Sequence, residues 1–151
     1  MNQGADMRKI GRIVVGVDGS ESSRAALRWA YDEAASHGAA LNVVTAWHPP
    51  PLPQFPPYGS LPPEGYFDQP KHNALALLDG LTAGLGEKSP PVDVRTVVEE
   101  GHPVQVLIEQ SAAADLVVVG SRGHGGFAGM LLGSVSHHLV AHSDCPVVVV
   151  R

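Results

Sequence analysis

The residues best suited to chemistry in this sequence are glycines and serines near its carboxyl end. Gly120-Ser-Arg-Gly123 directly follows the apolar run over residues 116–119, and Gly133-Ser134 comes after nine further residues. Glycines let backbone N–H groups approach an anion closely, because no Cβ is in the way. A helix that begins at Gly133 would add unpaired N–H groups and a partial positive charge. The pattern predicts a phosphate-binding loop, and we expect the ligand to be a nucleotide.

Two charged residues are candidates for the same site. Asp18 ends the apolar run over residues 12–18, where it can cap the helix that follows and can also lie near a ligand. Arg122 lies within the glycine-rich loop, where its guanidinium either contacts phosphates or faces solvent. The sequence leaves both roles of each residue open.

Composition narrows the class of protein. The chain has 151 residues, enough for one domain with its own core, and a formal net charge of −5, which argues against general binding to nucleic acid or anionic membranes. It has one cysteine, so an intrachain disulfide is excluded. Neither a signal peptide nor an apolar run of membrane-spanning length is apparent. We expect a soluble cytoplasmic protein that has no nucleic-acid or membrane partner.

The pattern of apolar residues predicts strands and helices in strict alternation. We expect strands at residues 12–18, 41–47, 92–98, 116–119 and 146–150. The first expected helix follows Ser20, helical spacing returns with Ala74, and two further helices begin at Pro103 and at Ser134. Gly38 and Gly86 can end the first two helices. Such alternation predicts an α/β fold, a parallel five-stranded sheet with helices on both faces. Ligands of such sheets bind beyond the carboxyl ends of the strands, where the strand order reverses.

A proline-rich segment interrupts this alternation at residues 48–70. Nine of the 13 prolines lie there, which disfavours both a helix and the interior of a sheet. The segment is either a lid or interaction loop, or a disordered insertion.

Four stretches carry a resemblance to a known family. They are Ile13-Val-Val-Gly-Val-Asp-Gly-Ser20, Ala114-Asp-Leu-Val-Val-Val-Gly-Ser-Arg-Gly123, Gly133-Ser-Val-Ser136 and Cys145-Pro-Val-Val-Val-Val-Arg151. The chain resembles a single-domain universal stress protein over residues 1–151, apart from the proline-rich segment. It is similar to the ATP-binding branch, whose pattern G-x2-G-x9-G-[S/T] is matched by Gly120, Gly123, Gly133 and Ser134.

The resemblance implies a fold, a ligand and a partner. It implies a Rossmann-like sheet of strand order 3-2-1-4-5, ATP bound with Mg²⁺ or Mn²⁺, and a role in the stress response. It also implies a homodimer through the last strand, residues 146–150, and a downstream protein partner that the sequence does not identify.

The resemblance also implies roles for particular residues. Asp18 would lie near the ribose or the metal-bound phosphates, Ala46 would meet adenine through backbone atoms, and Val119 would line the base or ribose. The glycines would allow close approach of the nucleotide, and the start of the last helix would supply N–H and hydroxyl groups to the phosphates. The full nucleotide-binding set is Gly16, Val17, Asp18, Ala46, Val119, Gly120, Arg122, Gly123, Gly133, Ser134, Val135 and Ser136.

The function that follows is a nucleotide-dependent regulatory module, and two other classes stay open. One is a slow ATPase in which Asp18 and a metal position water. The sequence has no G-x4-G-K-[S/T] loop, so a P-loop NTPase is excluded, and at most weak hydrolysis is expected. The other is a dimeric interaction module that binds another adenine nucleotide, such as AMP or a cyclic form.

Overall fold

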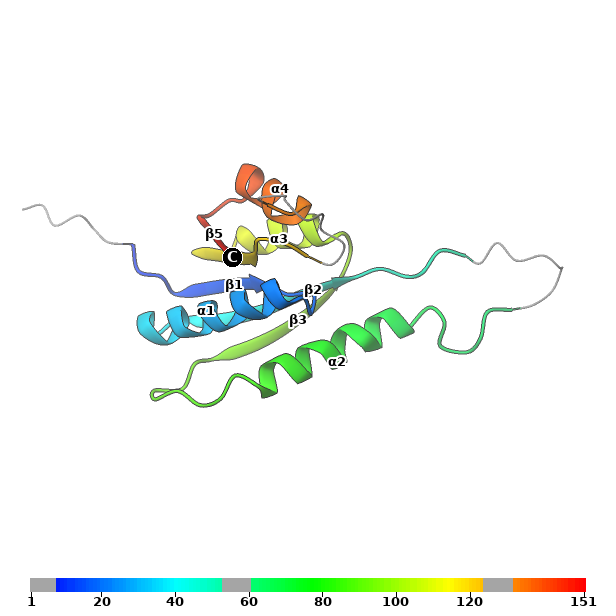
Figure 1. Cartoon of the computed structure of the whole chain (residues 1–151), viewed down its shortest axis with the longest axis horizontal. Coiled ribbons are helices and arrows are strands. Elements are labelled where there is room, and N and C mark those ends of the chain that lie inside the picture. Colours follow the sequence, from blue (N-terminus) through cyan, green and yellow to red (C-terminus); the bar gives the residue numbers. More distant parts are fainter. Residues whose placement is uncertain (1–7, 53–60, 124–131) are drawn as a thin grey trace, which may run out of the picture.

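The computed structural model describes residues 8–52, 61–123 and 132–151. Its centre is a five-stranded parallel sheet of order β3-β2-β1-β4-β5, which confirms the expected topology (Figure 1). Strands and helices alternate along the chain as β1 (Arg12–Gly16), α1 (Glu21–His37), β2 (Ala40–Trp47), α2 (Gln69–Ala83), β3 (Val94–Glu100), α3 (Pro103–Ser111), β4 (Leu116–Gly120), α4 (Ser134–His142) and β5 (Val147–Val150).

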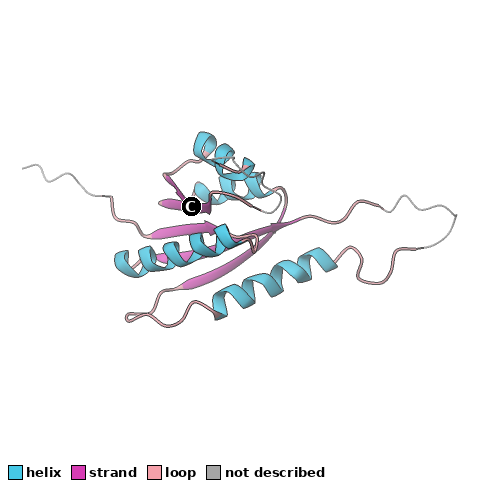
Figure 2. Ribbon diagram, viewed as in Figure 1, coloured by secondary structure: helices cyan, strands magenta, loops and turns pink. Residues whose placement is uncertain are grey.

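The helices cover the sheet in two pairs. Helices α1 and α2 pack on one face, where the buried core includes Ile13, Val15, Leu41 and Leu78. Helices α3 and α4 pack on the other face, over a smaller core that includes Val14 and Leu139 (Figure 2). Because both faces are covered, β1 and β4 are apolar along nearly their whole length, as is usual for parallel strands.

Helix α1 shows how local residues set the boundaries of an element. Ser20 is its N-cap and accepts a hydrogen bond from the backbone N–H of Ser23 at 3.2 Å. Gly38 ends the helix with a φ of 63°, a left-handed conformation that glycine adopts without strain. Asp18 does not cap the helix directly: its Oδ1 accepts from the N–H of Ser20 at 2.9 Å, which shapes the turn before the cap.

Some expected boundaries were wrong. Strand β1 ends at Gly16 rather than at Asp18, and β3 spans Val94–Glu100 rather than residues 92–98. The polar end of β3 belongs to the sheet because Glu100 pairs with Trp47, the last residue of the longer strand β2. Helix α2 ends at Ala83, so Gly86 lies beyond its end.

The proline-rich segment overlaps α2 by two residues. The helix begins at Gln69 with Pro70 in its first turn, where the missing N–H of proline is not needed. Residues 48–52 and 61–68 contain neither helix nor strand, and they run outward from the sheet (Figure 1). The hydroxyl of Tyr66 donates to the carbonyl of Pro51 at 3.2 Å, which ties these two stretches together. Residues 53–60 lie outside the described structure, and none of the described helices is long and apolar enough to cross a membrane.

Candidate functional site

A cavity of about 460 Å³ opens at the carboxyl edge of the sheet, where β1 and β4 lie side by side. After β1 the chain continues into α1 on one face of the sheet, and after β4 it continues into α4 on the other face. The cavity therefore lies at the point where the strand order reverses. All twelve residues of the predicted nucleotide-binding set line it: Gly16, Val17, Asp18, Ala46, Val119, Gly120, Arg122, Gly123, Gly133, Ser134, Val135 and Ser136. The structure therefore brings together residues from three strands and a helix that are up to 120 positions apart (136 minus 16).

One side of the cavity is apolar. Val44 and Val119 line it from the strands, and Val106 and Leu107 line it from α3; all four side chains are buried. A flat heteroaromatic ring can lose its hydration shell against such a surface at little cost, since no polar side chain there is left unpaired. This wall suits a nucleobase.

Another part of the cavity wall is the amino end of α4. Gly133 is the N-cap of this helix and has no side chain with which to cap it. The N–H groups of Ser134, Val135 and Ser136 belong to the first turn, where the helix itself supplies no acceptor. Together with the helix dipole they make this end attractive to an anion.

The loop ends that flank the undescribed residues 124–131 are joined directly. The N–H of Gly133 donates to the carbonyl of Ser121 at 2.6 Å. The hydroxyl of Ser136, which is only 2% exposed, lies 3.3 Å from the same carbonyl and 3.1 Å from that of Gly133. The start of α4 is thereby held against the end of β4.

Two of the glycines have packing partners inside the protein. A Cβ on Gly16 would lie 2.7 Å from Cδ1 of Leu107, so the missing side chain makes room for α3. A Cβ on Gly120 would meet the backbone of Ser22, with 2.7 Å to its carbonyl carbon. Close packing alone thus explains the glycine at these two positions. At Gly133, by contrast, the nearest atoms would be 3.4 Å away, an ordinary contact.

The charged side chains that line the described part of the cavity are Asp18 and Arg122. Asp18 Oδ1 accepts from Ser20, and its backbone N–H lies 3.3 Å from the hydroxyl of Ser23. The backbone N–H of Arg122 donates to the hydroxyl of Ser22 at 3.3 Å, while the Arg122 side chain is exposed. One carboxylate and one guanidinium thus lie at the rim of the phosphate-attracting end.

Six further lining residues were missed by sequence reasoning: Ser23, Val44, Thr45, Pro103, Val106 and Leu107. Val44 and Thr45 directly precede the predicted Ala46, so the end of strand two was a signal that could have found them. The three residues of α3 carry no motif. They reach the cavity because α3 crosses the sheet beside β1 and β2.

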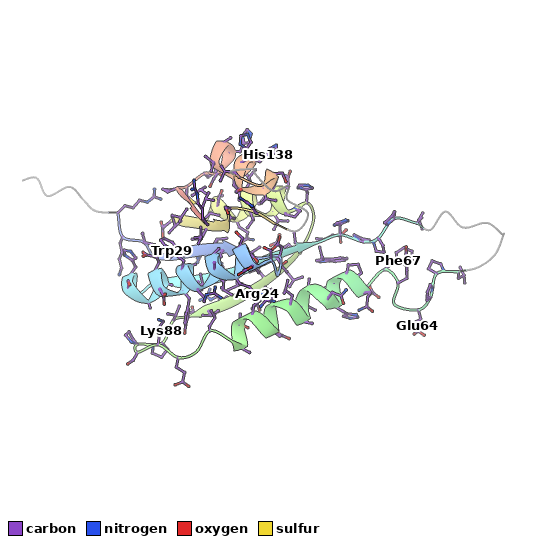
Figure 3. The ribbon with its side chains drawn as sticks, in the orientation of Figure 1. Arg24, Trp29, Glu64, Phe67, Lys88 and His138 are labelled. Carbon is purple, nitrogen blue, oxygen red and sulfur yellow. The ribbon has the colours of Figure 1, made fainter. Side chains whose placement is uncertain are left out.

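Two other reactive side chains of the described residues, Cys145 and His138, do not line the cavity. Burial raises the pKa of the Cys145 thiol above its ordinary value, which disfavours the reactive thiolate. His138 lies on the outer side of α4, with its Nδ1 2.7 Å from the carbonyl of Ser134 (Figure 3). Within residues 8–52, 61–123 and 132–151, no group of three or more His, Cys, Asp or Glu side chains could hold a metal ion.

Strand β5 forms one edge of the sheet. It pairs with β4, and in the described structure no strand pairs with its other side. All four of its valines are partly exposed. An apolar edge strand of this kind can pair with another chain.

Comparison with known proteins gives a family match over nearly the whole chain. The model of the universal stress protein family matches residues 9–151. A universal stress protein of Mycolicibacterium smegmatis is 39% identical over 140 residues, which make up 92% of this chain and 45% of that protein. The chain thus spans about half the length of the curated relatives that it matches.

Solved structures show the same fold. A universal stress protein from Lactobacillus plantarum superposes with a TM-score of 0.76 at 22% identity, covering 95% of this chain and 99% of that one. A second universal stress protein, solved in complex with cAMP, superposes with a TM-score of 0.68 at 29% identity, covering 95% and 98% of the two chains.

Proposed function

Since this chain belongs to the universal stress protein family, we propose that its cavity binds an adenine nucleotide and that the ligand is ATP. The observation that carries the proposal is the convergence of the glycine-rich loop, the start of α4 and the ends of β1, β2 and β4 on one cavity. Apolar side chains and a helix end that attracts anions line the same cavity, which suits the base and the phosphates of a nucleotide.

The base and the phosphates of the ligand occupy different parts of the cavity. The base lies against Val44 and Val119, with Ala46 offering backbone groups to its edge. The phosphates lie at the start of α4, where the N–H groups of Ser134, Val135 and Ser136 and the hydroxyl of Ser134 donate to them. Gly16, Val17, Gly120 and Gly123 line the path between the two ends, and Arg122 at the rim adds a positive charge.

A metal ion fits this site only together with the phosphates. Asp18 is the one carboxylate that lines the described part of the cavity, and Mg²⁺ in nucleotide sites is commonly held by one or two carboxylates and by phosphate oxygens. Asp18 would hold Mg²⁺ or Mn²⁺ through its carboxylate. When bound, the metal neutralises part of the phosphate charge, which also relieves the repulsion between Asp18 and the phosphates.

We propose that the bound nucleotide regulates rather than reacts. A ligand that binds one conformation more tightly than another shifts the protein toward that conformation, and a downstream partner in the stress response recognises the changed conformation.

The proposed assembly is a cytoplasmic homodimer in which residues 146–150 pair with their copy across a two-fold axis. The half-buried valines of β5 support this pairing, because it would cover an otherwise open edge.

Cyclic AMP is a second candidate ligand. The relative that is 29% identical to this chain was solved in complex with cAMP. A cyclic monophosphate carries one negative charge, so it would gain less from the α4 terminus and from a metal than ATP does. The two ligands therefore differ in how strongly they depend on Gly133 and Mg²⁺.

The test is calorimetric titration of nucleotide-free protein with ATP and with cAMP, each with and without Mg²⁺. We expect saturable binding of ATP that Mg²⁺ strengthens and that Gly133→Val abolishes. Gly80→Ala is the matched control, because a Cβ there would meet no atom within 4 Å. Tighter binding of cAMP, unaffected by Mg²⁺, would make the cyclic nucleotide the ligand. A folded wild type that binds neither would end the proposal.

A further inference from the structure

Ser136 is buried at the phosphate end of the cavity, and its hydroxyl faces the protein. It is 2% exposed and lies within hydrogen-bond distance of two backbone carbonyls, those of Ser121 and Gly133. A serine hydroxyl has one proton, so it donates to one of these carbonyls at a time or is shared between them. That proton is therefore engaged within the protein.

The backbone of Ser121 links three segments. Its carbonyl accepts from the N–H of Gly133 at 2.6 Å and lies 3.3 Å from the Ser136 hydroxyl. The N–H of Ser121 donates in turn to the carbonyl of Val150 at 2.8 Å. The first turn of α4 is thus fastened to the end of β4, and β4 to the end of β5, by bonds that do not involve residues 124–131.

From these contacts we propose that Ser136 is a positioning residue for phosphate binding: its hydroxyl holds the amino end of α4 against Ser121 and does not bind the phosphates itself. This inference rests on the proposed nucleotide function. The N–H groups at the start of a helix bind an anion best when they already point toward its binding position before the anion binds. Ser136 supplies that preorganisation, while Ser134, whose side chain is exposed at the same helix end, supplies direct contacts.

The test compares two serines on the same turn, first without nucleotide. In amide hydrogen exchange of the nucleotide-free protein, the Gly133 amide should exchange about tenfold faster in Ser136→Ala. The reason is that loss of one hydrogen bond raises the equilibrium constant for local opening by up to about tenfold. Ser134→Ala should leave that amide unchanged. Ser136→Thr keeps the hydroxyl and should restore slow exchange. The Val43 amide in β2 should be unaffected in all three variants, which separates a local effect from general destabilisation.

The second half of the test is binding. Ser136→Ala should weaken ATP about tenfold and leave adenosine, which has no phosphate, unchanged. Weaker ATP binding by Ser136→Ala with unaltered exchange at Gly133 would mean that the hydroxyl touches the phosphates, which would overturn the proposal. Faster exchange at Gly133 with unchanged ATP affinity would also overturn it. A wild type that binds no adenine nucleotide would overturn the proposed function instead, while the exchange data would still decide whether Ser136 fastens α4.

Discussion

The carboxylate of Asp18 lies where a side chain at position 123 would begin: a Cβ built on Gly123 would be 2.7 Å from Asp18 Oδ2. The turn between β1 and α1 therefore comes close to the glycine-rich loop after β4, at the end of the cavity where we place the phosphates. The absence of a side chain at Gly123 lets Asp18 keep its position beside Ser20.

Gly123→Ala should displace this carboxylate and weaken ATP binding by about tenfold, equivalent to about 1.4 kcal/mol. The free energy of unfolding should change less than the affinity, because both residues are exposed. Calorimetry and urea denaturation measure the two effects, with Gly80→Ala on the outer face of α2 as the control. Unchanged ATP affinity in Gly123→Ala would show that the position of Asp18 does not matter for binding.

Gly120→Ala should destabilise the fold itself. The new Cβ would lie 2.7 and 2.8 Å from the carbonyl carbon and oxygen of Ser22, and backbone atoms within a helix cannot move aside cheaply. Overpacking of this kind costs about 1–3 kcal/mol. Gly16→Ala should cost less, because its Cβ would meet the side chain of Leu107, which can change rotamer. Urea denaturation measures the free energy of unfolding of both variants. Equal losses of unfolding free energy in Gly120→Ala and Gly16→Ala would contradict the prediction.

Val149→Pro should dissociate the proposed dimer. The carbonyls of Pro146 and Val150 accept from β4, so in a parallel pair the backbone groups of Val149, one position before Val150, face the open edge. Proline removes the N–H that would pair with a second copy, yet an edge strand tolerates it. Sedimentation velocity should show a dimer for the wild type and for Val149→Ala, and a monomer for Val149→Pro. A Val149→Pro dimer would place the interface elsewhere.

Asp115 should make stability depend on pH below about 4. Backbone N–H groups of Gly11 and Arg12, at 2.9 and 3.0 Å, hold the pKa of this carboxyl below its ordinary value, with a smaller contribution from the Arg8 charge. The ionised form is therefore favoured by folding. Its contribution is complete above the unfolded pKa of about 3.9 and is lost as the pH falls through the folded pKa.

Asp115→Asn removes this titration. The difference in urea midpoint between the wild type and Asp115→Asn should be largest at neutral pH and should shrink as the pH falls below about 4. A difference that stays constant down to pH 3 would show that the hydrogen bonds matter but the charge does not.

The alternation of strands and helices and the phosphate end of the candidate site could be predicted from local patterns in the sequence. The strand order and the expected roles of Gly16, Ala46 and Val119 were instead implied by the family resemblance. Apolar runs separated by helical spacing imply a parallel sheet, and Ser20, Gly38 and Pro103 mark helix ends through their own backbone preferences. The glycine spacing after β4 pointed to the cavity end at which Gly133 and Ser134 now lie. These signals are short-range, so they can be read along one segment at a time.

What only the tertiary structure decided are the contacts between segments. The α3 wall of the cavity carries no motif, and it exists because that helix packs over Gly16. The reason for a glycine at position 120 is the backbone of Ser22, about 100 residues earlier in the chain. Likewise the Ser136 hydroxyl turns to Ser121 because both are buried at the junction of α4 and β4. Spacing along the chain shows which residue types can serve a ligand, but the direction of each side chain depends on the neighbours that folding places beside it.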